Sequence, residues 1–379
     1  MHTEQLSWTE ASGWVSSGGM AGAADLVLYF GKRTALANGA RYNELRARFP
    51  NAHLLGCSTG GQIRNRDIID DEIAAVALKF NGTTLKLACA PADGGARSRS
   101  CGEGIGRALA GNGLAGIFIL SDGLNINGSE LVAGIAASVG AQVPLSGGLA
   151  GDDANFESTL VGGDCAPRKN LVAAVGFYGN AVRFSHGSAG GWDEFGPHRR
   201  ITRSEGNILF ELDGKPALDI YKKYLAEEAA GLPGTALLFP LRIRDPRYAD
   251  YQMVRTVLAV DHAKGSMTFA GDMPQGWAAQ FMHGNFTRLA AGAADAARQA
   301  VATIGERDGV AIMVSCIGRR LLMGRRTIDE VNAASSVLGA DMPRLGFYSY
   351  GEITPTGAAG ASQLQNQTMT VTTISEIAA

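Results

Sequence analysis

Three glycine turns of the chain each carry a polar side chain at the same place, namely Gln62, Asp152 and Glu352. If the three turns converge in the fold, the carboxylates of Asp152 and Glu352 would recognise the amine or guanidinium of a small ligand. Tyr348 and Tyr350 stand beside Glu352 and could form a wall of such a pocket. The alternative is that each carboxylate caps the backbone N–H groups of its own turn.

A second candidate site is the glycine-rich segment 186–198, which places two imidazoles and two large aromatic rings in a short stretch. His186 and His198 flank the segment, and Trp192 and Phe195 lie between them. Neutral imidazole is a common axial ligand of haem iron, so this segment could hold a ligand or a haem. The alternative is that both are ordinary loop histidines with satisfied hydrogen bonds. The chain has no C-x-x-C-H sequence, which excludes covalent haem on motif grounds.

A nucleophile is suggested by residues 56–60, which read Gly-Cys-Ser-Thr-Gly and match the G-x-S-x-G pattern. Ser58 would need a histidine base and an orienting acid. The equivalent positions of the other two turns hold Gly148 and Tyr348, so the serine does not belong to the repeated unit. Cys57 would need a positive neighbour to become a thiolate. A serine or cysteine hydrolase is therefore kept as an alternative class, and we expect that the protein is not an enzyme.

The three turns belong to three copies of a strand–helix–strand pattern, over residues 28–62, 119–152 and 315–352. A repeated supersecondary unit predicts architecture, and alternating strands and helices indicate an α/β protein. A hairpin predicted around Asn81-Gly82 favours mixed sheets over wholly parallel ones. We therefore predict an α/β fold in two parts, with mixed sheets built from repeated strand–helix–strand units.

Three segments are expected along the chain. Residues 1–24 form a loosely patterned N-terminal segment in which we expect one helical turn around Thr9 to Val15, and a first domain covers residues 25–226. A break in the pattern occurs at Gly231, Pro233 and Gly234. A second domain therefore covers residues 227–379.

The composition limits the classes of function. The chain has 379 residues, of which 46% are hydrophobic and 18% charged, as in a well-buried globular protein. A net charge of −2 without a long basic block argues against nucleic acid as a partner. No apolar run approaches the ~18 residues of a membrane span, and the first residues lack the basic region of a secretory signal. Five scattered cysteines favour reduced thiols, so we expect a cytoplasmic protein.

Seven short motifs follow each other along the chain, at residues 55–63, 120–125, 147–152, 211–218, 239–241, 346–353 and 366–368. In this order they resemble the FIST family, in which an N-terminal FIST domain is followed by a C-terminal one. The resemblance covers about residues 25 to 376, which is nearly the whole chain. Gln62 departs from the glutamate that the family usually has at this position, which weakens a role for the first turn.

The resemblance implies a sensory module that binds a small ligand and passes the signal to a partner protein. Amino acids are the ligand class proposed broadly for FIST domains. In that version the ligand would contact Asp152, Tyr348, Tyr350 and Glu352. The chain carries no kinase, receiver or cyclic-nucleotide domain, so we expect it to signal by binding another protein. A homo-oligomer is kept as an alternative to a monomer.

Stand-alone members of this length resemble the nitric-oxide-sensing haem proteins of the NosP type. Such proteins hold b-type haem on a histidine and regulate a partner histidine kinase. In that version His186 is the first candidate for the iron ligand and His198 the second, with Trp192 and Phe195 as apolar contacts of the haem. The signal would be nitric oxide, and the partner a histidine kinase or another signalling protein.

Overall fold

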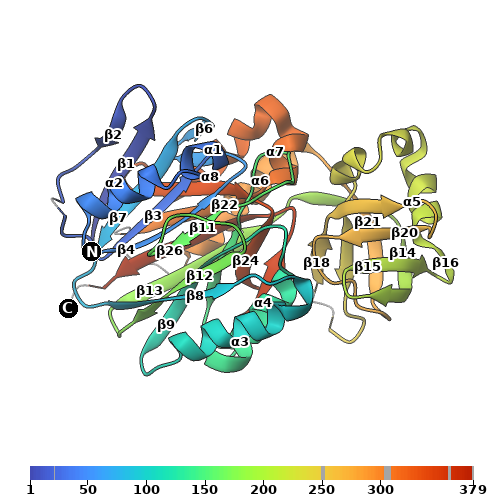
Figure 1. The fold of residues 1–379 in the computed structure, drawn as a ribbon. Helices are drawn as coiled ribbons and strands as arrows, with labels where there is room; N and C mark the ends of the chain where they lie inside the picture. Colours follow the sequence, from blue (N-terminus) through green and yellow to red (C-terminus); the bar gives the residue numbers. More distant parts are fainter. Residues whose placement is uncertain (21, 249–251, 303–308, 357–359, 378–379) are drawn as a thin grey trace.

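The chain forms two lobes of different size (Figure 1). The computed structural model describes residues 1–20, 22–248, 252–302, 309–356 and 360–377. The smaller lobe contains residues 192–284, and the larger lobe contains the described residues before and after them. The division at residue 226 into two sequence domains stays a prediction, because the lobes follow a different division.

Each strand–helix–strand unit supplies the one parallel strand pair of a six-stranded sheet in the larger lobe. The other strand pairs of the described residues are antiparallel, so the predicted α/β fold with mixed sheets is confirmed. The parallel pairs are β3 (Leu26–Gly31) with β4 (His53–Ser58), β9 (Leu114–Ser121) with β10 (Leu145–Leu149), and β22 (Val310–Cys316) with β23 (Arg344–Ser349).

The three sheets have the following strand orders. The first is β11 (Val161–Gly163), β4, β3, β7 (Ile73–Lys79), β1 (His2–Thr9) and β2 (Gly13–Ser16). The second is β25 (Ala361–Gln365), β24 (Gly351–Thr356), β10, β9, β12 (Leu171–Tyr178) and β8 (Thr84–Pro91). The third is β13 (Val182–Ala189), β26 (Met369–Glu376), β22, β23, β5 (Gln62–Arg64) and β6 (Asp67–Ile69).

After each of the three glycine turns, the next strand leaves the sheet of its own unit. Strand β5 of the first unit pairs with β23 of the third, β24 of the third pairs with β10 of the second, and β11 after the second pairs with β4 of the first. The three sheets are therefore linked in a closed cycle. The three turns at which the strands change sheets lie next to each other at its centre.

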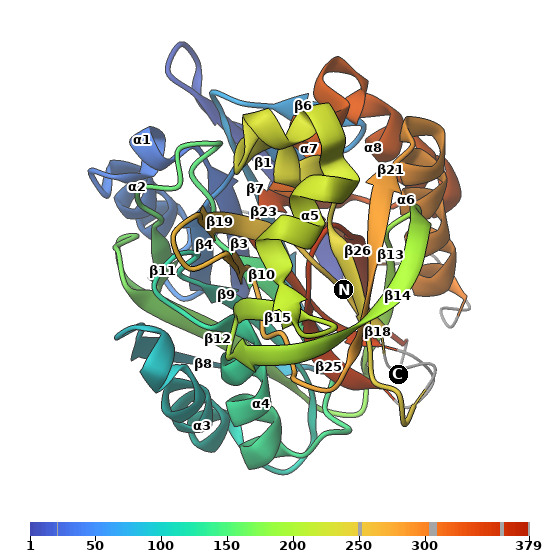
Figure 2. The same cartoon turned by 90° about the vertical axis from the view of Figure 1, so that its right-hand side faces the viewer.

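Three groups of helices cover the outside of this cycle, one beside each sheet (Figure 2). The first group is α1 (Arg33–Leu36) and α2 (Ala40–Arg48), and the second is α3 (Ser98–Leu109) and α4 (Gly128–Val139), preceded by η1 (Gly95–Arg97). The third is α6 (Phe286–Val301), α7 (Ile317–Met323), η4 (Gly324–Arg326) and α8 (Thr327–Leu338). Apolar strand residues form the cores between these layers; Phe30 and Phe347, for example, pack with ring centroids 4.4 Å apart.

The smaller lobe is a single antiparallel arrangement of strands with α5 (Ala217–Leu225) packed on it. Its strand order is β18 (Gln252–Arg255), β17 (Leu241–Arg244), β21 (Ala278–Gly284), β14 (Trp192–Glu205), β15 (Ile208–Leu212), β20 (Ser266–Phe269) and β19 (Val257–Asp261), and β16 (Lys215–Pro216) pairs with β15. The short helices η2 (Ala226–Gly231) and η3 (Gly234–Leu238) follow α5. Tyr221, Phe269 and Phe281 are fully buried in the core of this lobe.

One expectation for the chain start is wrong. Residues 1–24 contain the hairpin of β1 and β2 and no helical turn among the described residues, and β1 joins the first sheet by pairing with β7. The alternation of Leu6 and Trp8 with polar residues gives β1 one apolar face, which is the period of a half-buried strand. None of the helices in the described part of the chain is long and apolar enough to cross a membrane.

Candidate functional site: a pocket between the lobes

The three glycine turns form a ring of backbone hydrogen bonds. Each turn is bonded to the next: Gly60 N donates to Tyr348 O at 2.8 Å, Gly151 N to Ser58 O at 2.9 Å, and Tyr350 N to Leu149 O at 3.2 Å. The ring brings together the predicted polar positions Gln62, Asp152 and Glu352, which are 0%, 2% and 0% exposed. The convergence expected from the repeat therefore occurs, but inside the protein and not at an open surface.

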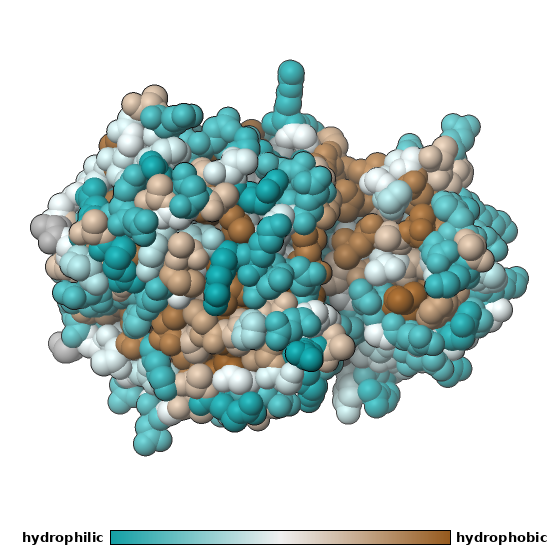
Figure 3. Space-filling model, in the orientation of Figure 1, coloured by the Kyte–Doolittle hydropathy of each residue, from teal (hydrophilic) through white to brown (hydrophobic). Residues whose placement is uncertain are grey.

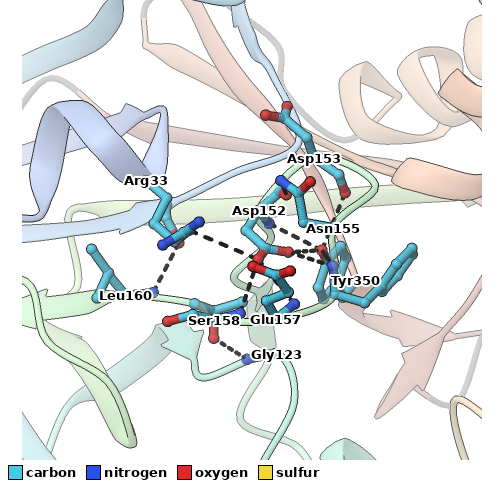
Figure 4. A network of polar contacts seen from close by, with 12 residues as sticks. Arg33, Gly123, Asp152, Asp153, Asn155, Glu157, Ser158, Leu160 and Tyr350 are labelled. Carbon is cyan, nitrogen blue, oxygen red and sulfur yellow. Dashed lines mark hydrogen bonds and ion pairs between the residues drawn. The ribbon is translucent and has the colours of Figure 1, made fainter.

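Asp152 caps its own turn, which is the alternative raised for it from the sequence (Figure 4). One carboxylate oxygen accepts the Tyr350 hydroxyl, and Arg33 Nε lies 3.8 Å from the other. The carboxylate also accepts three backbone N–H groups at 2.9 to 3.1 Å, those of Phe156, Glu157 and Ser158. With these partners Asp152 shapes the loop that follows it and fixes Tyr350, and its carboxylate is already occupied.

Glu352 and Tyr348 are also turned inward. Glu352 accepts the Ser349 hydroxyl at 2.8 Å, and its other oxygen accepts Thr368 N at 3.1 Å and Thr368 Oγ1 at 2.9 Å. The Tyr348 hydroxyl donates to Glu330 Oε1 at 3.0 Å. Both residues are fully buried and line none of the described cavities. Of the four residues predicted to contact a ligand, Tyr350 alone reaches a cavity.

Burial raises the pKa of Glu352 to about 8. The folded protein then keeps a proton that the unfolded chain releases near its ordinary pKa of 4.5. The contribution of Glu352 to the free energy of unfolding is fully present below about pH 4.5, and it is lost as the pH rises from there through about 8. We therefore compare the free energy of unfolding of Glu352→Gln with that of wild type. Between pH 5 and pH 8 the difference should shift in favour of the variant by about 3 kcal/mol. Urea unfolding of both proteins across this range measures it, and a pH-independent difference would contradict it.

The cavity that Tyr350 reaches is a pocket of about 410 Å³ between the two lobes. Hydrophobic side chains gather on the surface along this junction (Figure 3). The larger lobe contributes the loop after β9, the end of β10 and the start of α7, which are carboxyl ends of parallel strands and the usual place for ligands in α/β sheets. The smaller lobe contributes the β14–β15 turn and parts of β19 and β20.

The wall of the interlobe pocket is mainly apolar. Phe156 stacks on Tyr350 with ring centroids 4.6 Å apart, and Asp152 bonds to both residues, so the acid holds this aromatic pair in place. The apolar side chains of the wall include Leu124, Ile126, Leu149, Leu237, Leu258, Phe269 and Ile317. None of these residues was predicted from the sequence as part of a site, although the ends of β9 and β22 could have been found from the rule for carboxyl ends of parallel strands.

A few polar groups interrupt this wall. Thr256 is 4% exposed and its hydroxyl has no hydrogen-bond partner among the described residues. The Asn127 side chain donates to Asp272 at 2.8 Å and so links the two lobes, while Asn207 donates to Phe269 O at 2.8 Å. Burial, with Glu352 nearby, raises the pKa of the Cys316 thiol far above its usual range. The thiol is therefore neutral at pH 7.

The four residues predicted for haem lie in different environments. Trp192 is buried with its indole N–H bonded to Gln367 O at 2.7 Å, and Phe195 packs against Phe239 and Phe281 in the smaller lobe. His198 is exposed on β14, a strand and not the loop that was expected, at an irregularity between Phe195 and Arg199 in the pairing with β21. His186 lies on β13. The four side chains do not line one common cavity among those described, and no group of three or more metal-binding side chains occurs in the described part of the chain.

His186 is the exception among these residues, because one of its nitrogens is unused. Its Nδ1 lies 2.9 Å from Ser146 Oγ, whereas the buried Nε2 has no partner among the described residues. Burial lowers the pKa of His186 to about 4, so the imidazole is neutral at pH 7. His186 also lines a second cavity of about 590 Å³. Of the four predicted residues, His186 alone combines a buried, unpaired ring nitrogen with a place in the wall of a described cavity.

The residues of the hydrolase alternative are not activated. The Ser58 hydroxyl accepts a hydrogen bond from Leu160 N at 2.8 Å, and no hydrogen bond joins it to a histidine among the described residues. Burial raises the pKa of the Cys57 thiol well above its usual range. A nucleophile needs a base or a lowered pKa, and neither is present at these two side chains.

The fold and the pocket define a two-lobed α/β module with a site for a small molecule. A FIST N domain matches residues 25–215 and a FIST C domain matches residues 217–355. The chain therefore belongs to the FIST family, whose domains are sensory and bind ligands in signal transduction. It is also similar to the uncharacterized protein MJ1623 of Methanocaldococcus jannaschii, with 23% identity over 241 residues, which are 58% of this chain and 44% of that protein.

Proposed function

We propose that this FIST protein is a sensor that holds a small ligand in the pocket between its lobes and signals through a change in how the lobes sit on each other. The pocket carries the proposal, because its wall is formed by both lobes and its volume of about 410 Å³ is that of a small-molecule site. A ligand that contacts both lobes binds one arrangement of them better than others, which is the requirement for a signal.

Helix α7 connects the pocket to the junction of the lobes. Its first residues, Ile317 and Gly318, line the pocket. The next residue, Arg319, donates to the backbone carbonyls of Gly190 and Leu289, which lie beside the two places where the chain passes from one lobe to the other. A ligand that shifts α7 therefore acts on both segments that connect the lobes. The altered arrangement of the lobes would be recognised by a signalling partner.

A pocket-filling variant tests the proposal. Leu258 lines the pocket and is 47% exposed, so Leu258→Trp adds volume there without replacing a core side chain. We expect thermal-shift screening with uncharged and charged metabolites, including the amino acids, to find ligands that stabilise wild type and leave Leu258→Trp unchanged. A ligand at a hundredfold excess over Kd stabilises by about 2.7 kcal/mol.

The control for this screen is Val15→Trp, which adds the same side chain at a 51% exposed position of β2, remote from the pocket in the fold. Val15→Trp should respond to each ligand as wild type does. Ligands that stabilise Leu258→Trp as much as wild type would show that binding takes place elsewhere, and the proposal would fail.

Haem with nitric oxide as the signal, and a histidine kinase as the partner, is a finer version of this function. It is supported by the family resemblance and by the unpaired Nε2 of His186. The version predicts that the purified protein binds added haem, that nitric oxide shifts the Soret band, and that His186→Ala loses both. His198→Ala, at an exposed position, is the matched control. An unchanged spectrum of His186→Ala would remove this residue as the iron ligand.

An amino acid as the ligand is the other finer version. It was expected to use Asp152, Tyr348, Tyr350 and Glu352, and of these Tyr350 lines the pocket. The two carboxylates are already bonded to protein groups, so the ammonium group of an amino acid would have to find other partners. The amino acids in the thermal-shift screen test this version directly.

A further inference from the structure

We propose that the interlobe pocket selects an uncharged, mainly apolar small molecule that carries one hydrogen-bonding group. The inference rests on the proposed function and names the chemical class of its ligand. It follows from the side chains that form the wall, from the hydrogen bonds that the neighbouring acids already make, and from a buried hydroxyl group in the wall that has no partner among the described residues.

Among the described residues, the wall contains no side chain that is charged at neutral pH. The lining residues include no Asp, Glu, Lys, Arg or His among the described residues. The two ionisable side chains in it are Cys316 and Tyr350, and burial raises the pKa of both well above the usual range. A charged group of a ligand would therefore lose its water without gaining an opposite charge, which is unfavourable.

The nearest buried acids are saturated by protein groups. Asp122, directly after β9, accepts the backbone N–H groups of Leu124 and Asn125 at 2.9 and 2.7 Å and the Thr159 hydroxyl at 2.9 Å. Asp152 and Glu352 are bonded as described above. These three buried acids therefore hold the loops of the pocket in place and are not free to pair with a cationic ligand.

Thr256 supplies the polar contact. Its hydroxyl is buried in the wall and unpaired among the described residues, although buried hydroxyl groups are normally hydrogen-bonded. A hydroxyl both donates and accepts, so it can pair with an alcohol, an amide or a carbonyl of the ligand. The apolar remainder of such a ligand would lie against the Phe156–Tyr350 pair and Leu258.

Two fluorescent probes with one skeleton test the charge selectivity. N-phenyl-1-naphthylamine is uncharged, and 8-anilino-1-naphthalenesulfonate is the same skeleton with a sulfonate. We expect titration of the full chain to give at least tenfold tighter binding of the uncharged probe. Leu258→Trp should abolish this binding, and Val15→Trp should preserve it. Leu258→Arg places a cation in the wall and should improve binding of the sulfonate relative to the uncharged probe.

Naphthalene and 1-naphthol test the hydrogen bond in the same way. Competition against the uncharged probe should show that wild type prefers 1-naphthol, and Thr256→Val, which replaces the hydroxyl by a methyl group, should remove the preference. A preference that survives in Thr256→Val would overturn the role of this residue.

The remaining outcomes separate this inference from the proposed function. If both probes bind equally and Leu258→Trp abolishes both, the pocket binds ligands but does not select against charge, so the inference fails and the proposed function stands. If binding of the uncharged probe is the same in wild type and Leu258→Trp, the pocket is not the site, and both fail.

Discussion

Replacement of Arg319 by alanine will destabilise the protein by about 3–5 kcal/mol, the loss expected when one partner of a buried ion pair is removed. Arg319 is 0% exposed, and its guanidinium lies 2.8 Å from the carboxylate of Glu330, which is equally buried. The same guanidinium donates to the carbonyls of Gly190, Gln367 and Leu289. The variant therefore leaves a buried carboxylate without its cation and removes one donor from each of three carbonyls, of which Gln367 O keeps the indole N–H of Trp192.

Urea unfolding of the full chain, followed by tryptophan fluorescence, measures this loss. Arg325→Ala is the matched control, because Arg325 is exposed in η4, shortly after α7, and should change stability by no more than about 0.5 kcal/mol. Arg319→Lys keeps the charge but cannot supply the planar set of donors, so an intermediate loss is expected. A loss in Arg319→Ala as small as in the control would show that the junction of the lobes does not depend on this residue.

Asp152→Ala is expected to abolish binding in the interlobe pocket and to cost about 3 kcal/mol of stability, although Asp152 itself lines no part of the pocket. The carboxylate holds the Tyr350 hydroxyl and three consecutive backbone N–H groups. Each hydrogen bond to a charged group is worth about 1.5–3 kcal/mol, and part of the loss is recovered when water reaches the opened loop. Without the carboxylate, Phe156 and Tyr350 lose the hydrogen-bond acceptor that holds both of them in place.

Probe titration and urea unfolding of the same samples measure the two effects of Asp152→Ala. Glu157→Ala removes an exposed carboxylate from the same loop and should retain both binding and stability. Tyr350→Phe removes one of the bonds to Asp152 but keeps the stacked ring, so it should weaken binding less than Asp152→Ala does. Unchanged probe affinity in Asp152→Ala would contradict the supporting role of this residue.

The repeated strand–helix–strand pattern predicted the parallel strand pair in each sheet of the larger lobe, because glycine turns after buried strands are local features of a sequence. The pattern placed Gln62, Asp152 and Glu352 at equivalent points, and the structure brings them together. What the pattern could not show is the direction in which these side chains point. A carboxylate beside a turn can face a ligand or its own backbone, and that depends on the residues packed around it, such as Thr368 at Glu352.

The residues that form the wall of the pocket could not be predicted from the sequence for a related reason. Phe156, Leu258 and Ile317 come from three distant parts of the chain, and nothing local marks Leu258 or Thr256 as members of one site. Segment 186–198 shows the opposite case, in which residues close in sequence were expected to form one site. Such residues alternate between the two faces of a strand or lie in different strands. His186 on β13 and His198 on β14 therefore belong to different lobes.

The cyclic exchange of strands between the three sheets has a consequence for how the chain folds. Strand β26 lies between β13 and β22, so the third sheet cannot close until residues 369–376 have been synthesised. Strand β5 pairs with β23, and β24 pairs with β10. In both pairs the two strands are separated in sequence by more than half of the chain. Pairings between residues so far apart in sequence are slow to form. During synthesis on the ribosome the larger lobe therefore remains incomplete. Its open sheet edges need protection until β26 has been synthesised.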